Sequence, residues 1–243
     1  MNTEPPKEPS AVIRVKDLYK IYRVGETKVR ALNGVSFEIP KGEFVAIVGT
    51  SGSGKSTLLN MLAGLEKPTK GEILIGNVHI EKLTEKQLVA FRREKVGFIF
   101  QSYNLLNTMN AIENVALPLA FRGVPKKERL KKAREYMELV GVDKQEKHMP
   151  NQMSGGQQQR VGIARALVVK PQIIFADEPT GNLDPKNSLD IMNLLEDINK
   201  RGTTVVVVTH NKDIVNEMKK RVITLKKGVI ISDEKEGGYI DED

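Results

Sequence analysis

The feature that most limits the folds open to this chain is an eight-residue segment, Gly49 to Ser56. It reads Gly-Thr-Ser-Gly-Ser-Gly-Lys-Ser and fits the phosphate-loop pattern GxxxxGK[ST]. The apolar run Phe44 to Val48 precedes it, and a helix-like stretch from Thr57 to Gly64 follows it. A buried strand, a glycine-rich loop and a helix in this order cradle nucleotide phosphates, so the segment predicts a nucleotide site.

Each residue type in this loop has a chemical task. The glycines let backbone N–H groups wrap around the phosphates, Lys55 places a cation beside the β- and γ-phosphates, and Ser56 offers a hydroxyl to Mg²⁺. We therefore expect ATP and Mg²⁺ as ligands. The nucleotide is expected to contact Gly49, Thr50, Ser51, Gly52, Ser53, Gly54, Lys55, Ser56 and Thr57.

A second apolar run, Ile173 to Ala176, ends in two carboxylates, Asp177 and Glu178. Asp177 is placed to hold Mg²⁺ through water. Glu178, one residue further on, is placed to polarise a water molecule that attacks the γ-phosphate. Paired with the phosphate loop, these carboxylates predict ATP hydrolysis rather than binding alone.

The fold class follows from four short apolar runs: Phe44 to Val48, Val96 to Phe100, Ile173 to Ala176 and Thr204 to Val208. Runs that are apolar on both faces and separated by helical stretches predict a parallel sheet covered on both sides. At 243 residues the chain is expected to form one α/β domain. No run reaches the length needed to cross a bilayer, so we expect a protein inside the cell.

Helices and smaller strands complete this outline. Periodicity predicts helices at Thr84 to Lys95, at Lys126 to Val140 and after the N-cap and proline pair Asp184-Pro185. Three short strands, expected to form a small antiparallel sheet, are Val12 to Val15, Val35 to Ile39 and Glu72 to Ile75. Residues 1–10 are expected to be a frayed tail, and the stretch from Asp233 to Asp243 to be loosely held.

A third motif, Met153 to Arg160, reads Met-Ser-Gly-Gly-Gln-Gln-Gln-Arg and opens a helix between the first two. Ser154 is the expected N-cap, and two glycines, Gly155 and Gly156, permit a close approach to the helix end. Because a helix N-terminus attracts anions, this segment can grip a second phosphate.

These motifs together resemble those of the ABC ATPases, whose signature LSGGQ this chain matches except that Met153 replaces Leu. The resemblance spans nearly the whole chain. It implies a RecA-like phosphate-loop NTPase core with a parallel sheet, an antiparallel β-subdomain and an inserted α-helical subdomain at about residues 102–165. All of these are expected within a single ATP-binding domain over residues 11–243.

The resemblance also assigns residues that the patterns alone leave open. Tyr22 matches the aromatic residue that stacks on adenine, and Gln101 matches the residue that links Mg²⁺ to a membrane partner. Asp184 lies in the counterpart of the D-loop, and His210 matches the switch histidine. In this family the signature residues Ser154, Gly155, Gly156 and Gln157 contact the nucleotide held by a second copy.

The resemblance therefore implies a homodimer in the ATP-bound state, coupled to a separate integral membrane permease at the inner face of the cell membrane. The single copy of each motif agrees with this expectation. Apolar residues after Gln101 are expected to line the permease groove: Tyr103, Leu105, Leu106, Met109, Ile112 and Val115.

Within the family the chain resembles the lipoprotein-release and macrolide-export branch, of the LolD, MacB and FtsE type. This rests on four segments: Met61 to Gly71, Phe98 to Leu106, Glu113 to Val115 and Gln157 to Arg160. An amino-acid importer ATPase, and a regulatory or mechanotransmitting ATPase that acts without transport, remain alternatives. Although the net charge is +7, we expect no nucleic acid partner, because the interval from Gln101 to Met153 is too short for the coiled coil of a chromosome-structure ATPase.

Overall fold

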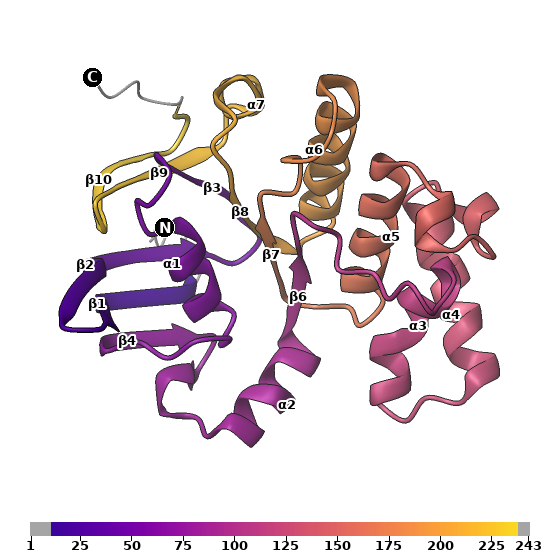
Figure 1. Cartoon of the computed structure of the whole chain (residues 1–243), viewed down its shortest axis with the longest axis horizontal. Helices are drawn as coiled ribbons and strands as arrows, with labels where there is room; N and C mark the ends of the chain where they lie inside the picture. Colours follow the sequence, from indigo (N-terminus) through magenta and orange to yellow (C-terminus); the bar gives the residue numbers. More distant parts are fainter. Residues whose placement is uncertain (1–10, 238–243) are drawn as a thin grey trace, which may run out of the picture.

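The computed structural model describes residues 11–237, so the predicted tail at residues 1–10 and the last six residues lie outside the described part. Two sheets organise the chain: a four-stranded sheet in the order β2-β1-β4-β5 and a six-stranded sheet in the order β10-β9-β3-β8-β7-β6. Figure 1 shows the first sheet at one end of the molecule and a group of helices at the other, with the six-stranded sheet between them. This is the expected α/β arrangement.

The helices and strands have definite bounds. The strands are β1 (Ala11–Val24), β2 (Thr27–Pro40), β3 (Phe44–Val48), β4 (Lys70–Ile75), β5 (Val78–His79), β6 (Val96–Ile99), β7 (Ile173–Asp177), β8 (Thr204–Val208), β9 (Arg221–Lys226) and β10 (Val229–Glu234). The α-helices are α1 (Lys55–Leu62), α2 (Glu85–Lys95), α3 (Ala111–Phe121), α4 (Lys126–Leu139), α5 (Gly155–Leu167), α6 (Pro185–Lys200) and α7 (Lys212–Met218). Short 3₁₀ turns are η1 (Ile80–Lys82), η2 (Asp143–Gln145) and η3 (Pro150–Gln152).

The central strands β3, β8, β7 and β6 are parallel and have helices on both sides. Alternate residues of β8 enter two different apolar clusters: Val205 and Val207 enter one, and Val206 and Val208 enter the other. Because side chains along a strand alternate between faces, this division means that both faces of the sheet are buried. The predicted doubly covered sheet is confirmed, and it holds the ends of β3 and β7 at the same edge of the sheet, one on each side of β8.

The antiparallel sheet was predicted correctly in kind but not in length. β1 and β2 are each 14 residues long and pair from Ala11 with Pro40 to Val24 with Thr27. The predicted strands, Val12 to Val15 and Val35 to Ile39, cover only part of β1 and β2. The stretch at residues 27–30 was missed because its residues are exposed and show no alternation of polar and apolar side chains. The extra length carries the hairpin toward the phosphate loop.

Helices α3, α4 and α5 pack together at the end of the molecule opposite the antiparallel sheet (Figure 1). α3 begins with a reciprocal cap, in which the Asn110 side chain accepts from the Glu113 N–H and the Glu113 carboxylate accepts from the Asn110 N–H. Ile112 and Val115 are buried in this helical core, so the expectation that they line a partner groove is wrong. Both residues lie on the face of α3 that packs into the core.

The C-terminal strands correct another expectation. Asp233 belongs to β10 and accepts hydrogen bonds from Arg221 of β9, both at 2.7 Å. Arg221 also donates to the Glu43 carboxylate at 2.8 Å and to the Glu38 carbonyl. The bidentate pair therefore anchors Asp233, at the start of the segment that composition suggested to be loose, while residues 238–243 of that segment lie outside the described part. Within residues 11–237, no helix is both long enough and apolar enough to cross a membrane.

Candidate active site

The phosphate loop connects the end of β3 to the start of α1. Gly49 has φ +147°, and a Cβ placed there would lie 2.1 Å from the Leu225 carbonyl oxygen. Gly54, the residue before α1, has φ +106°, and its Cβ would lie 2.4 Å from the Ala31 carbonyl oxygen. Both positions combine a left-handed backbone with a close neighbour, so they require glycine.

Lys55 is the first residue of α1, and its side chain folds back over the loop. The ammonium donates to the carbonyl oxygens of Gly49 at 2.7 Å and Thr50 at 2.9 Å. Burial lowers the pKa of Lys55, while the nearby carboxylates of Glu178 and Asp177 act in the opposite direction. The loop thus carries a desolvated cation that lies close to both carboxylates.

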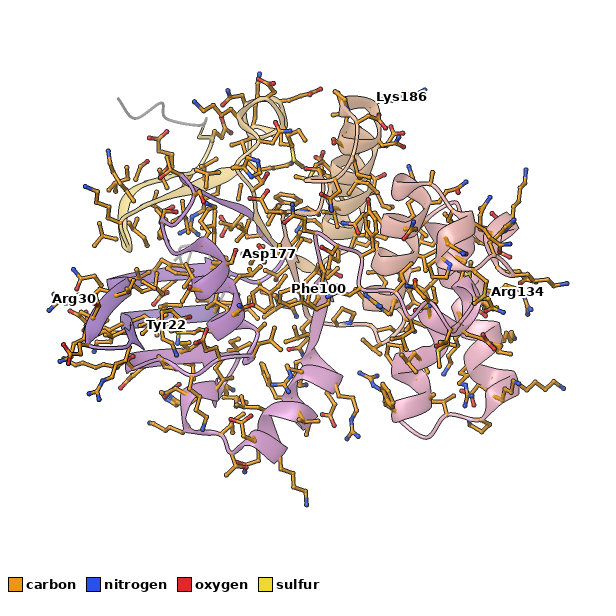
Figure 2. The ribbon with its side chains drawn as sticks, in the orientation of Figure 1. Tyr22, Arg30, Phe100, Arg134, Asp177 and Lys186 are labelled. Carbon is orange, nitrogen blue, oxygen red and sulfur yellow. The ribbon has the colours of Figure 1, made fainter. Side chains whose placement is uncertain are left out.

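Asp177 at the end of β7 meets the same loop. The Ser56 hydroxyl donates to Asp177 Oδ1 at 3.1 Å. Figure 2 shows Asp177 near the middle of the molecule, between the antiparallel sheet and the helices α3 to α5. Burial raises the pKa of Asp177, and the hydrogen bond from Ser56 acts against that rise. A hydroxyl and a carboxylate oxygen thus converge at the end of the parallel sheet.

Glu178 is held in an unusual backbone conformation, with φ +47°. Its N–H donates to the Val208 carbonyl at 2.9 Å, which ties this residue to the end of β8. One carboxylate oxygen lies 2.7 Å from His210 Nδ1, and the other accepts from the His210 N–H at 3.3 Å. Left-handed non-glycine residues are costly and gather at functional sites, so the conformation supports the prediction that Glu178 is a functional residue.

A cavity of about 510 Å³ lies beside the phosphate loop. Nine of the predicted site residues line this cavity, together with three residues of β2. The lining residues are Val29, Arg30, Ala31, Ser51, Gly52, Gly54, Lys55, Ser56, Thr57, Gln101, Glu178 and His210. A pocket of this size, bounded by a cation and a carboxylate, suits a nucleotide's phosphates.

The sequence did not identify Val29, Arg30 and Ala31 as pocket residues. Gly25, which has φ +60°, turns the chain back along β2, but a turn of this kind does not indicate where the hairpin lies. Tyr22, predicted to stack on adenine, is not among the lining residues. Its hydroxyl donates to the Glu66 carboxylate at 2.7 Å, and the Lys20 ammonium lies 5.1 Å from its ring centroid; Figure 2 shows Tyr22 and Arg30 on the antiparallel sheet.

Gln101 follows β6 and reaches the cavity from the side of the helices. Its carbonyl accepts from Asn182 Nδ2 at 3.0 Å, so the segment after β6 is joined to the segment before α6. Gln159 on α5 makes a related connection that the sequence did not reveal. Its buried amide donates to the Pro179 carbonyl at 2.6 Å and to the Phe100 carbonyl at 3.4 Å.

The signature residues form the N-terminus of α5, away from this cavity. Ser154 is the N-cap: its hydroxyl accepts from the Gln157 N–H at 3.3 Å, and the Gln157 side chain accepts from the Ser154 N–H at 3.0 Å. A Cβ on Gly155 would lie 2.7 Å from the Tyr103 hydroxyl, and one on Gly156 would lie 2.7 Å from Asn187 Oδ1. The glycines thus admit side chains of this same chain.

Asp184 caps α6 beside that end. Its carboxylate accepts from the Asn187 N–H at 3.0 Å and from the Asn187 side chain, and these bonds lower its pKa. None of Ser154, Gly155, Gly156, Gln157 and Asp184 lines the phosphate-loop cavity. The structure therefore brings together the residues of the phosphate loop, Gln101, Glu178 and His210, and leaves the signature helix end as a separate surface.

Known proteins with this organisation are numerous. A family model described as "ABC transporter" matches residues 32–181. The chain is 48% identical over 228 residues to the cell division ATP-binding protein FtsE of Bacillus subtilis, covering 94% of this chain and 98% of that protein. It is 47% identical over 227 residues to the macrolide export ATP-binding/permease protein MacB of Chlorobaculum tepidum, covering 92% of this chain but only 34% of that longer protein.

A solved structure gives the same answer for the fold. The dimeric ATP-binding cassette MJ0796 of Methanocaldococcus jannaschii, in a post-hydrolysis state bound to ADP and Pi, superimposes with a TM-score of 0.86. That structure is 45% identical to this chain, and the match covers 93% of this chain and all of the other. Since the family match spans more than half of the chain and these relatives cover nearly all of it, the chain belongs to the ABC transporter family, as an ATP-binding and ATP-hydrolysing subunit.

Proposed function

We propose that this chain works as one half of a head-to-tail ATP-bound dimer and drives a separate membrane permease. One observation supports the dimer: the cavity gathers the groups predicted to bind and cleave ATP, whereas Ser154 at the start of α5 does not line it. A second copy can bring its own α5 N-terminus to the open side of this cavity. ATP then completes the interface between the two copies.

The hydrolytic chemistry follows from the geometry of three residues. Lys55 supplies positive charge to the β- and γ-phosphates when they displace its bonds to the loop carbonyls. Glu178 orients and polarises the attacking water, because its carboxylate lies at the cavity wall beside the loop. His210, bonded to Glu178 at 2.7 Å, fixes the direction of that carboxylate.

Mg²⁺ belongs to the same proposal. The Ser56 hydroxyl and Asp177 carboxylate lie 3.1 Å apart and are oxygen ligands of the kind Mg²⁺ takes, with Gln101 as a further oxygen donor at the cavity. When bound, the cation neutralises negative charge that develops on the phosphates. The protein's part is to hold the hydroxyl and carboxylate together at the ends of α1 and β7.

In the dimer, the residues at the start of α5 contact the γ-phosphate held by the other copy. Ser154 offers its hydroxyl, and the N–H groups of Gly155 and Gly156 lie at the positive end of the helix dipole. Gln157 and Asp184 lie on the same surface. Tyr22 stacks on adenine with the ring face opposite Lys20, since the Lys20 ammonium already lies over one face.

The permease binds at an apolar groove of about 550 Å³ formed by α2, β6, α3 and α5. Val89, Leu117, Pro118 and Phe121 line it, and Phe121 is 69% exposed and Val89 53% exposed. Two such large apolar residues side by side are unusual on a free surface. Leu106 is also exposed, but the groove includes residues of α2, which precede the apolar residues after Gln101 that the sequence suggested.

The relatives favour a membrane-transport subunit related to MacB and FtsE over an amino-acid importer. We place the chain at the inner face of the cell membrane, held there by its permease. We also retain the division into one ATP-binding domain over residues 11–243, with a helical subdomain at about residues 102–165 that holds α3, α4 and most of α5.

The first experiment tests the hydrolytic proposal with the purified chain. Phosphate release from ATP should require Mg²⁺ and should fall on chelation with EDTA, and Asp177→Asn should raise the Mg²⁺ concentration needed for half-maximal turnover. Release that is indifferent to EDTA, or an Asp177→Asn chain with unchanged Mg²⁺ dependence, contradicts the metal assignment.

A second experiment tests the groove. Phe121→Asp should remove stimulation of turnover by the membrane protein that co-purifies with the chain, measured after reconstitution, while basal turnover survives. Ile231→Asp is the matched control, because Ile231 is also an exposed apolar residue but lies on β10. Equal stimulation of both variants would exclude the groove from the permease interface.

A further inference from the structure

Two consecutive residues just after Gln101 have left-handed backbones. Tyr103 has φ +58° and Asn104 has φ +50°. Asparagine tolerates this region, but a bulky aromatic residue rarely adopts it. A pair of this kind persists only where its surroundings hold it in place, so another part of the chain must fix the backbone from Gln101 to Asn104; we call such a contact a clamp.

Arg165 is that clamp. Its guanidinium donates to the Tyr103 carbonyl at 2.8 Å and also to the Asn104 carbonyl. The planar guanidinium holds both carbonyls at once, which fixes their relative orientation. The Gly162 position one turn earlier on α5 also lies against this segment, since a Cβ there would meet the Tyr103 carbonyl at 3.7 Å.

The same side chain faces in a second direction. Arg165 lines the apolar groove together with Val89 and Phe121. Whatever fills the groove therefore contacts the residue that holds the backbone two and three positions beyond Gln101. The Tyr103 hydroxyl in turn lies against Gly155 at the signature end, so the clamped segment contacts the start of α5 as well.

We propose that Arg165 is the positioning residue through which occupancy of the groove acts on Gln101. By holding Tyr103 and Asn104, Arg165 fixes the position of Gln101 at the nucleotide cavity. The same side chain contacts whatever occupies the groove. This inference rests on the proposed function of the groove. It assigns Arg165 a task distinct from substrate contact, since Arg165 does not line the nucleotide cavity.

The first test compares turnover parameters in the isolated chain. Arg165→Met keeps the aliphatic length but removes the clamp, so kcat should fall roughly 10- to 100-fold while ATP affinity stays unchanged. Arg165→Lys, with a single ammonium, should recover part of kcat. Arg122→Met is the matched control, because Arg122 also donates to two backbone carbonyls, those of Arg93 and Val169, but does not touch residues 103–104.

The second test fills the groove directly. The chain contains no cysteine, so Val89→Cys provides a single site for N-phenylmaleimide at the groove. Labelling should change kcat by roughly threefold or more when Arg165 is present, and should have no effect in the Arg165→Met background. The same label on Ile231→Cys should change kcat in neither background.

These outcomes separate the inference from the function beneath it. If Phe121→Asp leaves stimulation by the membrane protein unchanged, the proposed function of the groove fails; if it removes that stimulation, the remaining results judge Arg165 alone. Equal label effects with and without Arg165, no label effect in either background, or an Arg165→Met chain with the kcat of Arg122→Met would each overturn the proposal.

Discussion

The two helix N-termini expected to grip phosphate are built differently. α1 starts after Gly54, which has a left-handed backbone and gives no side-chain cap, so the first N–H groups of the helix face the cavity without competition from a capping side chain. α5 is capped by its own Ser154 and Gln157. One end is prepared for a strong anion, and the other already satisfies part of its donors within the chain.

Their surroundings differ in the same sense. Lys55 and Glu178 line the cavity at α1, and Asp177 is bonded to Ser56 there. At α5, the residues Ser154 to Gln157 include no cation and no carboxylate. The comparison teaches that a helix dipole alone can attract a phosphate, whereas hydrolysis also requires charged groups. Of the two helix ends, α1 has these groups and Ser154 to Gln157 do not. In the proposed dimer, the start of α5 therefore completes the nucleotide site of the other copy.

The largest effect is expected at the first end. Lys55→Ala removes the one lysine among the described residues that line the cavity. The ATP affinity should fall by at least about 100-fold, because a charged hydrogen-bonding group is lost from a partly buried phosphate site. Equilibrium binding of a fluorescent ATP analogue measures this. Lys86→Ala, at an exposed position of α2, is the control and should bind normally; an unchanged dissociation constant for Lys55→Ala would remove the phosphate assignment.

A change at the second end should separate binding from turnover. Ser154→Arg leaves the cavity of its own chain intact, so ATP affinity should change little, but the large cation obstructs the partner's site and hydrolysis should be lost. Mixing this variant with Lys55→Ala chains should restore at most one working site per dimer. Normal turnover by Ser154→Arg alone would show that the two ends do not meet.

A smaller effect should come from the glycines at α5. Gly156→Ala places a methyl group 2.7 Å from Asn187 Oδ1, and the unfolding free energy should fall by about 1–3 kcal/mol. Denaturant unfolding measures this, and Asn187→Ala should restore most of the loss in the double variant. No rescue would mean that the crowding at Gly156 comes from another neighbour.

Much of this molecule is predictable from its sequence, because strong local patterns agree with the fold. The runs of β3 and β8 were found with their observed bounds, since buried parallel strands leave unbroken apolar stretches. Asp184 and Ser154 were found as N-caps because capping chemistry is local.

Other features depend on residues far apart in the chain. Nothing near Val29 or Arg30 indicates that the β1–β2 hairpin reaches the cavity, because that placement depends on long-range strand pairing. A side chain at position 155 would collide with the Tyr103 hydroxyl, which is far away in the sequence. Likewise, Asp233 is held by Arg221. Such contacts come from tertiary packing, which local patterns do not encode.

The central claim is that hydrolysis at the first end and closure by the second end are separable steps. Glu178→Gln keeps the size of the side chain but removes the charge that polarises water, so turnover should stop while ATP binding survives. Size-exclusion chromatography with light scattering, run with and without saturating ATP, should then show a stable dimer only with ATP. A Glu178→Gln chain that stays monomeric in ATP, or that hydrolyses ATP at the wild-type rate, would contradict the account.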